Sequence, residues 1–247
     1  MRGVLFDKDG TLLDFEASWS GVYRELCLDL AEGDADIAQS MLVAGGLDPE
    51  TGRFRSGGAL AAGNTIDIVR IWYPSLSRGA ERAMVERIDR VFHANGITCS
   101  VPVPGLRQTL AALAEAGFAM GVATSDGTAA ARAAISALGL DAYLPHVFGY
   151  DSVPSPKPAP DIVHAFSKAI GVPPREIVVI GDNPHDLEMA RSAGAGAAIG
   201  VLTGNSARHE LAPLADAVLD SVCDLPAWLH SRSSRSGPGR SGEPALP

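Results

Sequence analysis

The pattern of apolar and polar positions changes twice along this chain. Residues 3–6 form a short apolar run that ends in the charged sequence DKDG, which predicts a buried strand that leads into a loop. Between residues 18 and 97 the apolar positions recur at helical spacing, and a Gly-rich, charged stretch, GGLDPETGRFRSGG, interrupts them as an exposed loop. The expected helices of this part cover residues 19–30, 37–44, 60–72 and 82–94.

Beyond Pro104 the pattern alternates between strand-like and helix-like runs. The predicted strands cover residues 118–123, 146–148, 177–180, 197–201 and 217–219. The predicted helices cover residues 105–115, 128–138, 160–170 and 186–193. Strands that alternate with helices indicate a parallel sheet covered on both faces. We therefore predict an α/β fold, a doubly wound, Rossmann-like parallel sheet with an inserted all-α domain.

This pattern divides the chain into three parts. The core domain is expected over residues 1–14 and 101–231, and the helical cap domain over residues 15–100. Residues 232–247 are rich in Ser, Gly, Pro and Arg, so we expect a disordered tail.

Composition narrows the class of protein. A hydrophobic content of 46% is ordinary for a globular protein. The net charge of −9 does not indicate a surface that binds nucleic acid or an anionic membrane. The three cysteines lie far apart, so neither a disulfide framework nor a zinc site is expected. The first apolar run is broken at once by acids, and no apolar run approaches the ~20 residues of a membrane span. We expect a cytoplasmic protein.

Four short polar segments stand out against this background, most of them directly after a predicted strand. In chain order they are Asp7–Thr11, Thr124–Ser125, Lys157 and Gly181–Asp186. Residues just past the carboxyl ends of neighbouring parallel strands meet at one crevice. Segments that are more than a hundred residues apart in sequence are therefore expected to form one site.

The residue types in these segments suit the hydrolysis of a phosphate ester. A carboxylate nucleophile divides the reaction into two transfers, and a second carboxylate can protonate the leaving alcohol and then activate water. A divalent cation and a lysine would offset the charge of the phosphate. Oxygen ligands for Mg²⁺ could come from Asp7, the backbone carbonyl of Asp9 and Asp182, while Thr124 and Ser125 could hold the transferred oxygens.

In this order, FDKDGTLLD, GVATSDG, SPKPAPD and IGDNPHDLEMARSAG resemble motifs one to four of the haloacid-dehalogenase superfamily. The run AGAGAAIGVLTG and the helical insertion resemble its phosphoglycolate-phosphatase-like subgroup. The resemblance implies a Mg²⁺-dependent phosphatase for a small phosphorylated metabolite, with phosphoglycolate as the first candidate.

The resemblance also assigns roles to individual residues. It implies that Asp7 is the nucleophile and a metal ligand, that Asp9 is the general acid and base, and that Thr124 and Lys157 bind phosphate. It further implies that Asp182 binds the metal. Asp186 is expected either to bind the metal directly or to contact the residues that bind it. Gly10 and Ser125 are expected at the substrate.

Relatives with the same core motifs are only partly excluded. A dehalogenase needs no acid for a halide leaving group, so Asp9 argues against that activity. A phosphonatase would need a cap lysine to form an imine, and residues 15–100 contain no lysine. A sugar-phosphate mutase of the β-phosphoglucomutase type shares the core motifs and stays open.

Two non-enzymatic functions are less consistent with the sequence. Phospho-accepting receiver modules place their acid pair before the phosphorylated Asp and lack an ~80-residue helical insertion. A binding protein that kept the fold would have no need of intact acid and lysine positions. The choice between monomer and homodimer is open.

Several neighbouring residues carry further expectations. Arg53 and Arg55 lie two residues apart in the cap loop, so both side chains could project from the same side of an extended segment. They could then bind a substrate carboxylate. The alternative is that both are solvated arginines of an exposed loop. Alternation predicts that the Lys8 side chain points away from the two acids. His185 is expected at the surface and Trp19 in the core of the cap.

Overall fold

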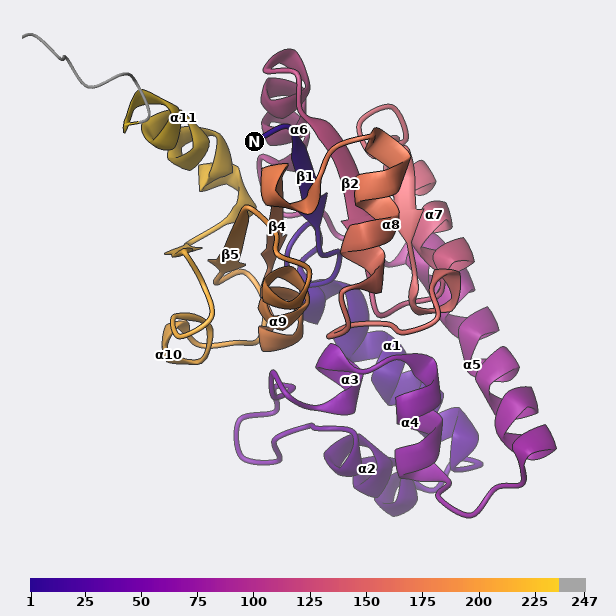
Figure 1. Cartoon of the computed structure of the whole chain (residues 1–247). Helices are drawn as coiled ribbons and strands as arrows, with labels where there is room; N and C mark the ends of the chain where they lie inside the picture. Colours follow the sequence, from indigo (N-terminus) through magenta and orange to yellow (C-terminus); the bar gives the residue numbers. More distant parts are fainter. Residues whose placement is uncertain (236–247) are drawn as a thin grey trace, which may run out of the picture.

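A six-stranded parallel sheet forms the centre of the molecule in the computed structural model, which describes residues 1–235 (Figure 1). The strands lie in the order β3-β2-β1-β4-β5-β6, with all neighbours parallel. Their bounds are β1 Gly3–Phe6, β2 Ala119–Ala123, β3 His146–Phe148, β4 Ile177–Gly181, β5 Ala197–Val201 and β6 Ala217–Leu219. The predicted strands are all present, and the predicted α/β class is confirmed.

Helices cover both faces of this sheet, which explains why its strands are apolar at almost every position. The core helices are α6 Leu106–Glu115, α7 Thr128–Ala137, α8 Asp161–Ile170, α9 Pro184–Ser192, α10 Arg208–Leu211 and α11 Leu225–Arg235. Val4 and Phe6 of β1 pack with α6, α7 and α11, whereas Leu5 between them packs with α8, α9 and α10. Successive side chains of one strand therefore enter two separate apolar layers.

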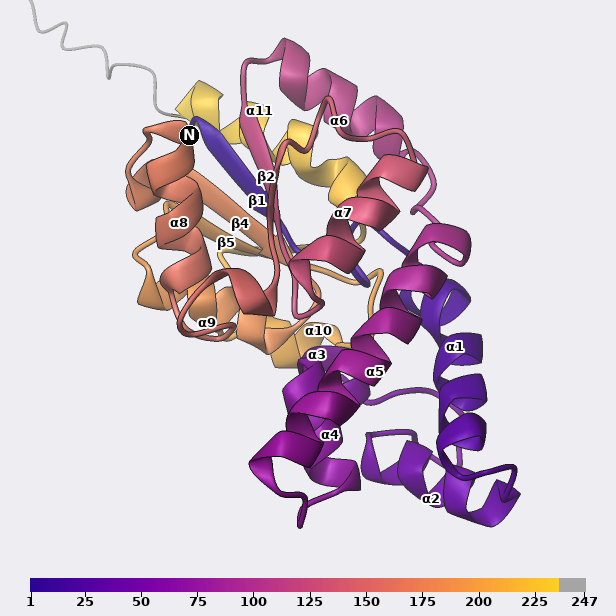
Figure 2. The same ribbon diagram turned by 90° about the vertical axis from the view of Figure 1, so that its right-hand side faces the viewer.

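The inserted segment builds a third apolar core of its own at one end of the sheet (Figure 1, Figure 2). Its helices are α1 Phe15–Leu30, α2 Ala35–Ala44, α3 Ala59–Ala62, α4 Thr65–Trp72 and α5 Arg78–Thr98. Asp14 caps α1 by accepting a hydrogen bond from the Ala17 backbone N–H, as expected for an Asp at this position. The long α5 also packs against α7 of the core.

The region predicted as one helix over residues 60–72 consists of two, α3 and α4. The break lies at Gly63 and Asn64, where the Asn64 side chain accepts hydrogen bonds from the backbone of Ile66 and Asp67. Asp67 in turn accepts from the Asn64 backbone N–H, which completes a capping box. This local capping stops α3 from continuing into α4.

The described part of the chain ends in α11, which runs to Arg235. Residues 232–235, expected in the disordered tail, therefore belong to a helix, and residues 236–247 lie outside the described residues. Among residues 1–235, none of the helices combines the length and apolarity needed to cross a membrane.

Candidate active site

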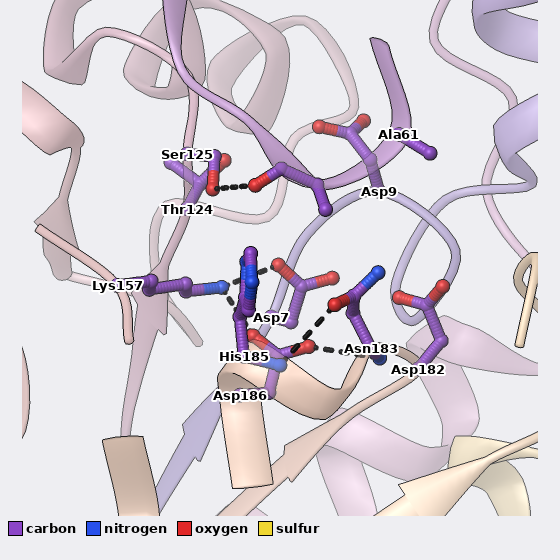
Figure 3. Close-up of a pocket in the computed structure, with 11 residues that line it drawn as sticks. Asp7, Asp9, Ala61, Thr124, Ser125, Lys157, Asp182, Asn183, His185 and Asp186 are labelled. Atoms are coloured by element: carbon purple, nitrogen blue, oxygen red, sulfur yellow. Dashed lines mark hydrogen bonds and ion pairs between the residues drawn. The ribbon is translucent and has the colours of Figure 1, made fainter. Parts of the chain in front are cut away.

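A small cavity lies at the carboxyl edge of the sheet, where the helical segment faces the core (Figure 3). Its volume is about 30 Å³. The side chains of four polar segments line it together with two alanines of α3: Asp7, Asp9, Ala61, Ala62, Thr124, Ser125, Lys157, Asp182, Asn183, His185 and Asp186. The sequence segments that were expected to converge therefore do so.

Lys157 links two of the carboxylates in this cavity. Its Nζ lies 2.7 Å from Asp7 Oδ1 and 2.6 Å from Asp186 Oδ1. The Lys157 side chain is only 3% exposed, although it belongs to a Pro-rich loop. Burial alone would lower the pKa of Lys157, but the carboxylates of Asp186 and Asp7 outweigh it and raise that pKa. The ammonium is therefore fixed in its charged form beside Asp7.

Three carboxylates meet at this point. One oxygen each of Asp7, Asp182 and Asp186 lies within 4.8 Å of the others. Burial raises the pKa of Asp7 to about 6, although Lys157 opposes the shift. Burial also raises the pKa of Asp182 well above its usual value, and Asp7 and Asp186 add to it.

The charge in this cluster is unbalanced. Three carboxylates and one ammonium sum to −3 + 1 = −2 when all are ionised. A divalent cation would balance this charge, and carboxylate oxygens are the ligands that Mg²⁺ prefers. The donor set therefore fits Mg²⁺.

Asp186 has structural partners besides Lys157. Its Oδ2 accepts a hydrogen bond from the Asn183 backbone N–H at 3.1 Å and so caps α9. Asp182 is held from other sides, by the Thr11 hydroxyl at 3.4 Å and the Asn205 backbone N–H at 3.2 Å. Gly10, at φ +89°, packs so closely on the Asp182 carboxylate that a Cβ there would lie 2.6 Å from it.

The Asp9 carboxylate points away from this cluster and toward the cap. Its Oδ1 accepts a hydrogen bond from Trp19 Nε1 at 2.6 Å, and its Oδ2 lies 2.6 Å from Lys8 Nζ. Lys8 Nζ is also 3.4 Å from Asp126 Oδ2 and 5.1 Å from the centre of the Trp19 ring. Asp9 thus stands between the catalytic cavity and the cap.

The position of Lys8 corrects one expectation from the sequence. Alternation predicted a side chain that points away from the acids, but Lys8 is fully buried and paired with Asp9 and Asp126. The reason is that β1 ends at Phe6, so the two-residue period of a strand no longer applies at Lys8. Trp19 lies in the cap core, as expected, and also binds Asp9.

The other residues predicted to bind the substrate differ in their position relative to the cavity. Thr124 is buried and lines the cavity, and the Ser125 hydroxyl donates to the backbone carbonyl of Ala62 at 3.1 Å. Gly10 does not line it, and its N–H donates to the Leu13 carbonyl at 2.7 Å within the tight turn after β1.

Arg53 and Arg55 also lie outside the cavity. Both are exposed, while Phe54 and Ser56 between and after them are buried. The alternation places the two arginines on one side of the loop, but this side faces solvent, and Arg55 lies 4.0 Å from Asp48. The structure therefore does not bring them to the site.

Two polar lining residues were not predicted as parts of the site, in addition to Ala61 and Ala62. His185 was expected at the surface, yet it lines the cavity, and its buried Nδ1 has no hydrogen-bond partner among the described residues. Asn183 reaches the cap through its Nδ2, which donates to the Ser56 carbonyl at 2.6 Å. Both follow Asp182 at the start of α9, and this proximity in sequence was the available signal.

Comparisons with known proteins show which family the chain is similar to. A model of the haloacid dehalogenase-like hydrolases matches residues 1–194. A phosphoglycolate phosphatase of Rhodospirillum rubrum is 28% identical over 233 residues, which cover 92% of this chain and 90% of that protein. One of Photorhabdus laumondii is 28% identical over 197 residues, covering 78% of this chain and 77% of that protein.

The fold has close counterparts among solved structures. A predicted phosphoglycolate phosphatase from Haemophilus somnus superimposes with a TM-score of 0.71 at 20% identity. The match covers 93% of this chain and 98% of that one. At this identity the likeness concerns the fold alone.

Proposed function

The chain belongs to the haloacid dehalogenase-like hydrolases and is a phosphatase, and from this we propose that it hydrolyses a small phosphate monoester through a phosphorylated Asp7 with Mg²⁺ as cofactor. The observation that carries this proposal is the buried contact between Lys157 and the Asp7 carboxylate, at 2.7 Å, inside a cavity lined by three more carboxylates. A buried carboxylate beside a fixed ammonium suits attack on a phosphate dianion, because the ammonium offsets the repulsion between them.

In the first step, an Asp7 oxygen attacks phosphorus and the bond from phosphorus to the leaving oxygen breaks. Lys157 holds Asp7 in place and offsets the negative charge of the phosphoryl oxygens, and Thr124 lies on the same cavity wall. Mg²⁺ held by Asp7 and Asp182, with Asp186 beside them, would supply further positive charge at the phosphate.

Asp9 carries the proton in this scheme. Its carboxylic acid protonates the leaving oxygen, so the product departs as an alcohol. The resulting carboxylate then takes a proton from water, which attacks phosphorus and breaks its bond to Asp7. Inorganic phosphate leaves and the Asp7 carboxylate is restored.

Phosphoglycolate is the reference substrate for this activity, because several of the curated relatives are named for it. The catalytic cavity itself contains no feature that reads the rest of the ester. The residues that line it suit a phosphate. The leaving group would therefore be recognised by the neighbouring cap.

The test is the replacement of Asp7 by Asn. Asp7→Asn should lower kcat for release of inorganic phosphate by at least ~10³-fold, since it removes the nucleophile and a metal ligand together. EDTA should abolish the activity of the unchanged protein, and added Mg²⁺ should restore it.

Asp14→Asn is the matched control, because Asp14 is exposed, caps α1 and can be replaced in that role by Asn. It should keep the activity of the unchanged protein. Robust turnover by a folded Asp7→Asn protein would refute the mechanism.

A further inference from the structure

A second cavity of about 40 Å³ adjoins the catalytic cavity on the cap side. The two share Asp9, Ala61 and Ser125 as lining residues. If the phosphate occupies the first cavity, as the proposed function requires, the oxygen that Asp9 protonates lies at their junction. The leaving group of the substrate then extends into the second cavity.

The walls of the second cavity are mostly aromatic and aliphatic. Trp19 stacks on Tyr23 with ring centres 5.7 Å apart, and Phe92 meets Trp19 edge-on at 5.5 Å. These rings belong to the buried core of the cap, together with Ile68. Rings that are fixed in a packed core give the cavity a defined shape, so it selects by size as well as by polarity.

The cavity offers no cation to an anionic leaving group. Among the described residues that line it, none is a lysine, arginine or histidine. Every arginine of residues 15–100 is exposed, and this segment has no lysine. Lys8, which lies behind Asp9, is already paired with Asp9 and Asp126 at 2.6 and 3.4 Å.

Three of the four side-chain donors of the walls are also occupied. The indole of Trp19 donates to Asp9, the hydroxyl of Thr65 donates to Asp89, and the hydroxyl of Ser125 donates to a backbone carbonyl. Burial raises the pKa of Tyr23, the remaining donor, and the charges of Asp9 and Asp126 raise it further. The environment of that hydroxyl is therefore unfavourable to a negative charge.

From this we propose that the preferred substrate is the phosphate monoester of a small, largely apolar alcohol that carries no negative charge, and that the cap cavity discriminates against phosphoglycolate. A water molecule needs roughly 10–15 Å³ of such space, so about 40 Å³ holds a group of only a few non-hydrogen atoms. A carboxylate in this space would lie beside the charges of Asp9 and Asp126, and the one nearby cation, Lys8, is already paired with both.

The experiment compares two esters of similar size with the full chain and Mg²⁺, propyl phosphate and phosphoglycolate. We expect kcat/KM for propyl phosphate to exceed that for phosphoglycolate by ~10²-fold or more, because a charge without a partner is costly to bury. A value for phosphoglycolate that equals or exceeds that for propyl phosphate would overturn the proposal.

A cation placed at the junction should reverse the preference. Ala61 is partly exposed and lines both cavities, so Ala61→Lys brings an ammonium to the mouth of the cap cavity. The ratio of kcat/KM for phosphoglycolate to that for propyl phosphate should rise about tenfold or more, as for a charged hydrogen bond. In the matched variant Ala61→Gln it should stay within about twofold, because the added amide has no charge. An equal change in both variants, or none in either, would contradict the proposed electrostatics.

Acetyl phosphate separates this proposal from the proposed function, because its leaving group needs little protonation. If acetyl phosphate and both esters resist hydrolysis, the phosphatase mechanism and the specificity both fail. If Mg²⁺-dependent hydrolysis occurs but phosphoglycolate is the better substrate, only the specificity fails.

Discussion

The two adjoining cavities differ sharply in what lines them. The catalytic cavity holds four carboxylates and one ammonium, whereas the cap cavity has mostly aromatic and aliphatic walls and no lysine, arginine or histidine among its described lining residues. Phosphoryl transfer moves charge, so its site needs fixed charges, while recognition of a small leaving group depends on shape and on the absence of unpaired charge. The molecule separates these two tasks between its core and its cap.

The two cavities also differ in how they are held. The catalytic side chains follow strands of one sheet, whose backbone fixes their distances. The cap cavity depends on hydrogen bonds between the two parts, including Asn183 to the Ser56 carbonyl at 2.6 Å and Tyr150 to Asp89 at 2.8 Å. Asp9 belongs to both cavities, and its replacement tests their connection directly.

Asp9→Asn should reduce kcat by ~10²–10⁴-fold on an alkyl phosphate, because the leaving alkoxide loses its proton donor. The reduction should be smaller on an aryl phosphate, whose leaving group departs without much protonation. Steady-state release of phosphate from both esters measures the difference. An equal reduction on the two esters would show that Asp9 is not the leaving-group acid.

Lys8→Met should lower the free energy of unfolding by roughly 3 to 5 kcal/mol, because it leaves the partly buried carboxylates of Asp9 and Asp126 without their cation. The matched control is Lys168→Met, since Lys168 is exposed on α8 and its loss should change stability by less than about 0.5 kcal/mol. Urea unfolding followed by circular dichroism measures both. If the two variants unfold alike, Lys8 does not stabilise the acids at the junction.

Arg53→Ala and Arg55→Ala should have the smallest effects. Both arginines face solvent outside the two cavities, so kcat/KM for phosphoglycolate and for an aryl phosphate should each change by less than about twofold. A selective loss on phosphoglycolate, near the ~1.5–3 kcal/mol of a charged hydrogen bond, would show that the cap loop reaches the substrate. It would also contradict the proposed exclusion of anionic leaving groups.

The strands and the catalytic segments could be predicted from the sequence because their signals are local. Near-continuous apolar runs such as residues 177–180 are typical of strands buried on both faces, and the polar residues directly after them mark the carboxyl edge. The topology of a parallel sheet was therefore enough to predict that Asp7, Lys157 and Asp182 lie close together. The residue types then suggested the chemistry.

The residues whose position depends on turns and on distant neighbours could not be placed in this way. The direction of the Lys8 side chain follows from the turn after β1, and its partner Asp126 is far away in the sequence. Histidine is common at protein surfaces, and only the arrangement of several segments around His185 makes it part of a cavity.

The sequence by itself determined the order of the strands and helices along the chain and the set of residues available for phosphate chemistry, because both depend on residue type and on spacing along the backbone. Only the tertiary structure decided the nature of the cap cavity. Its walls are formed by contacts such as that between Trp19 and Phe92, from two helices that are separated by three others. Such contacts depend on how the helices pack against one another and against the core, and no local pattern specifies that packing.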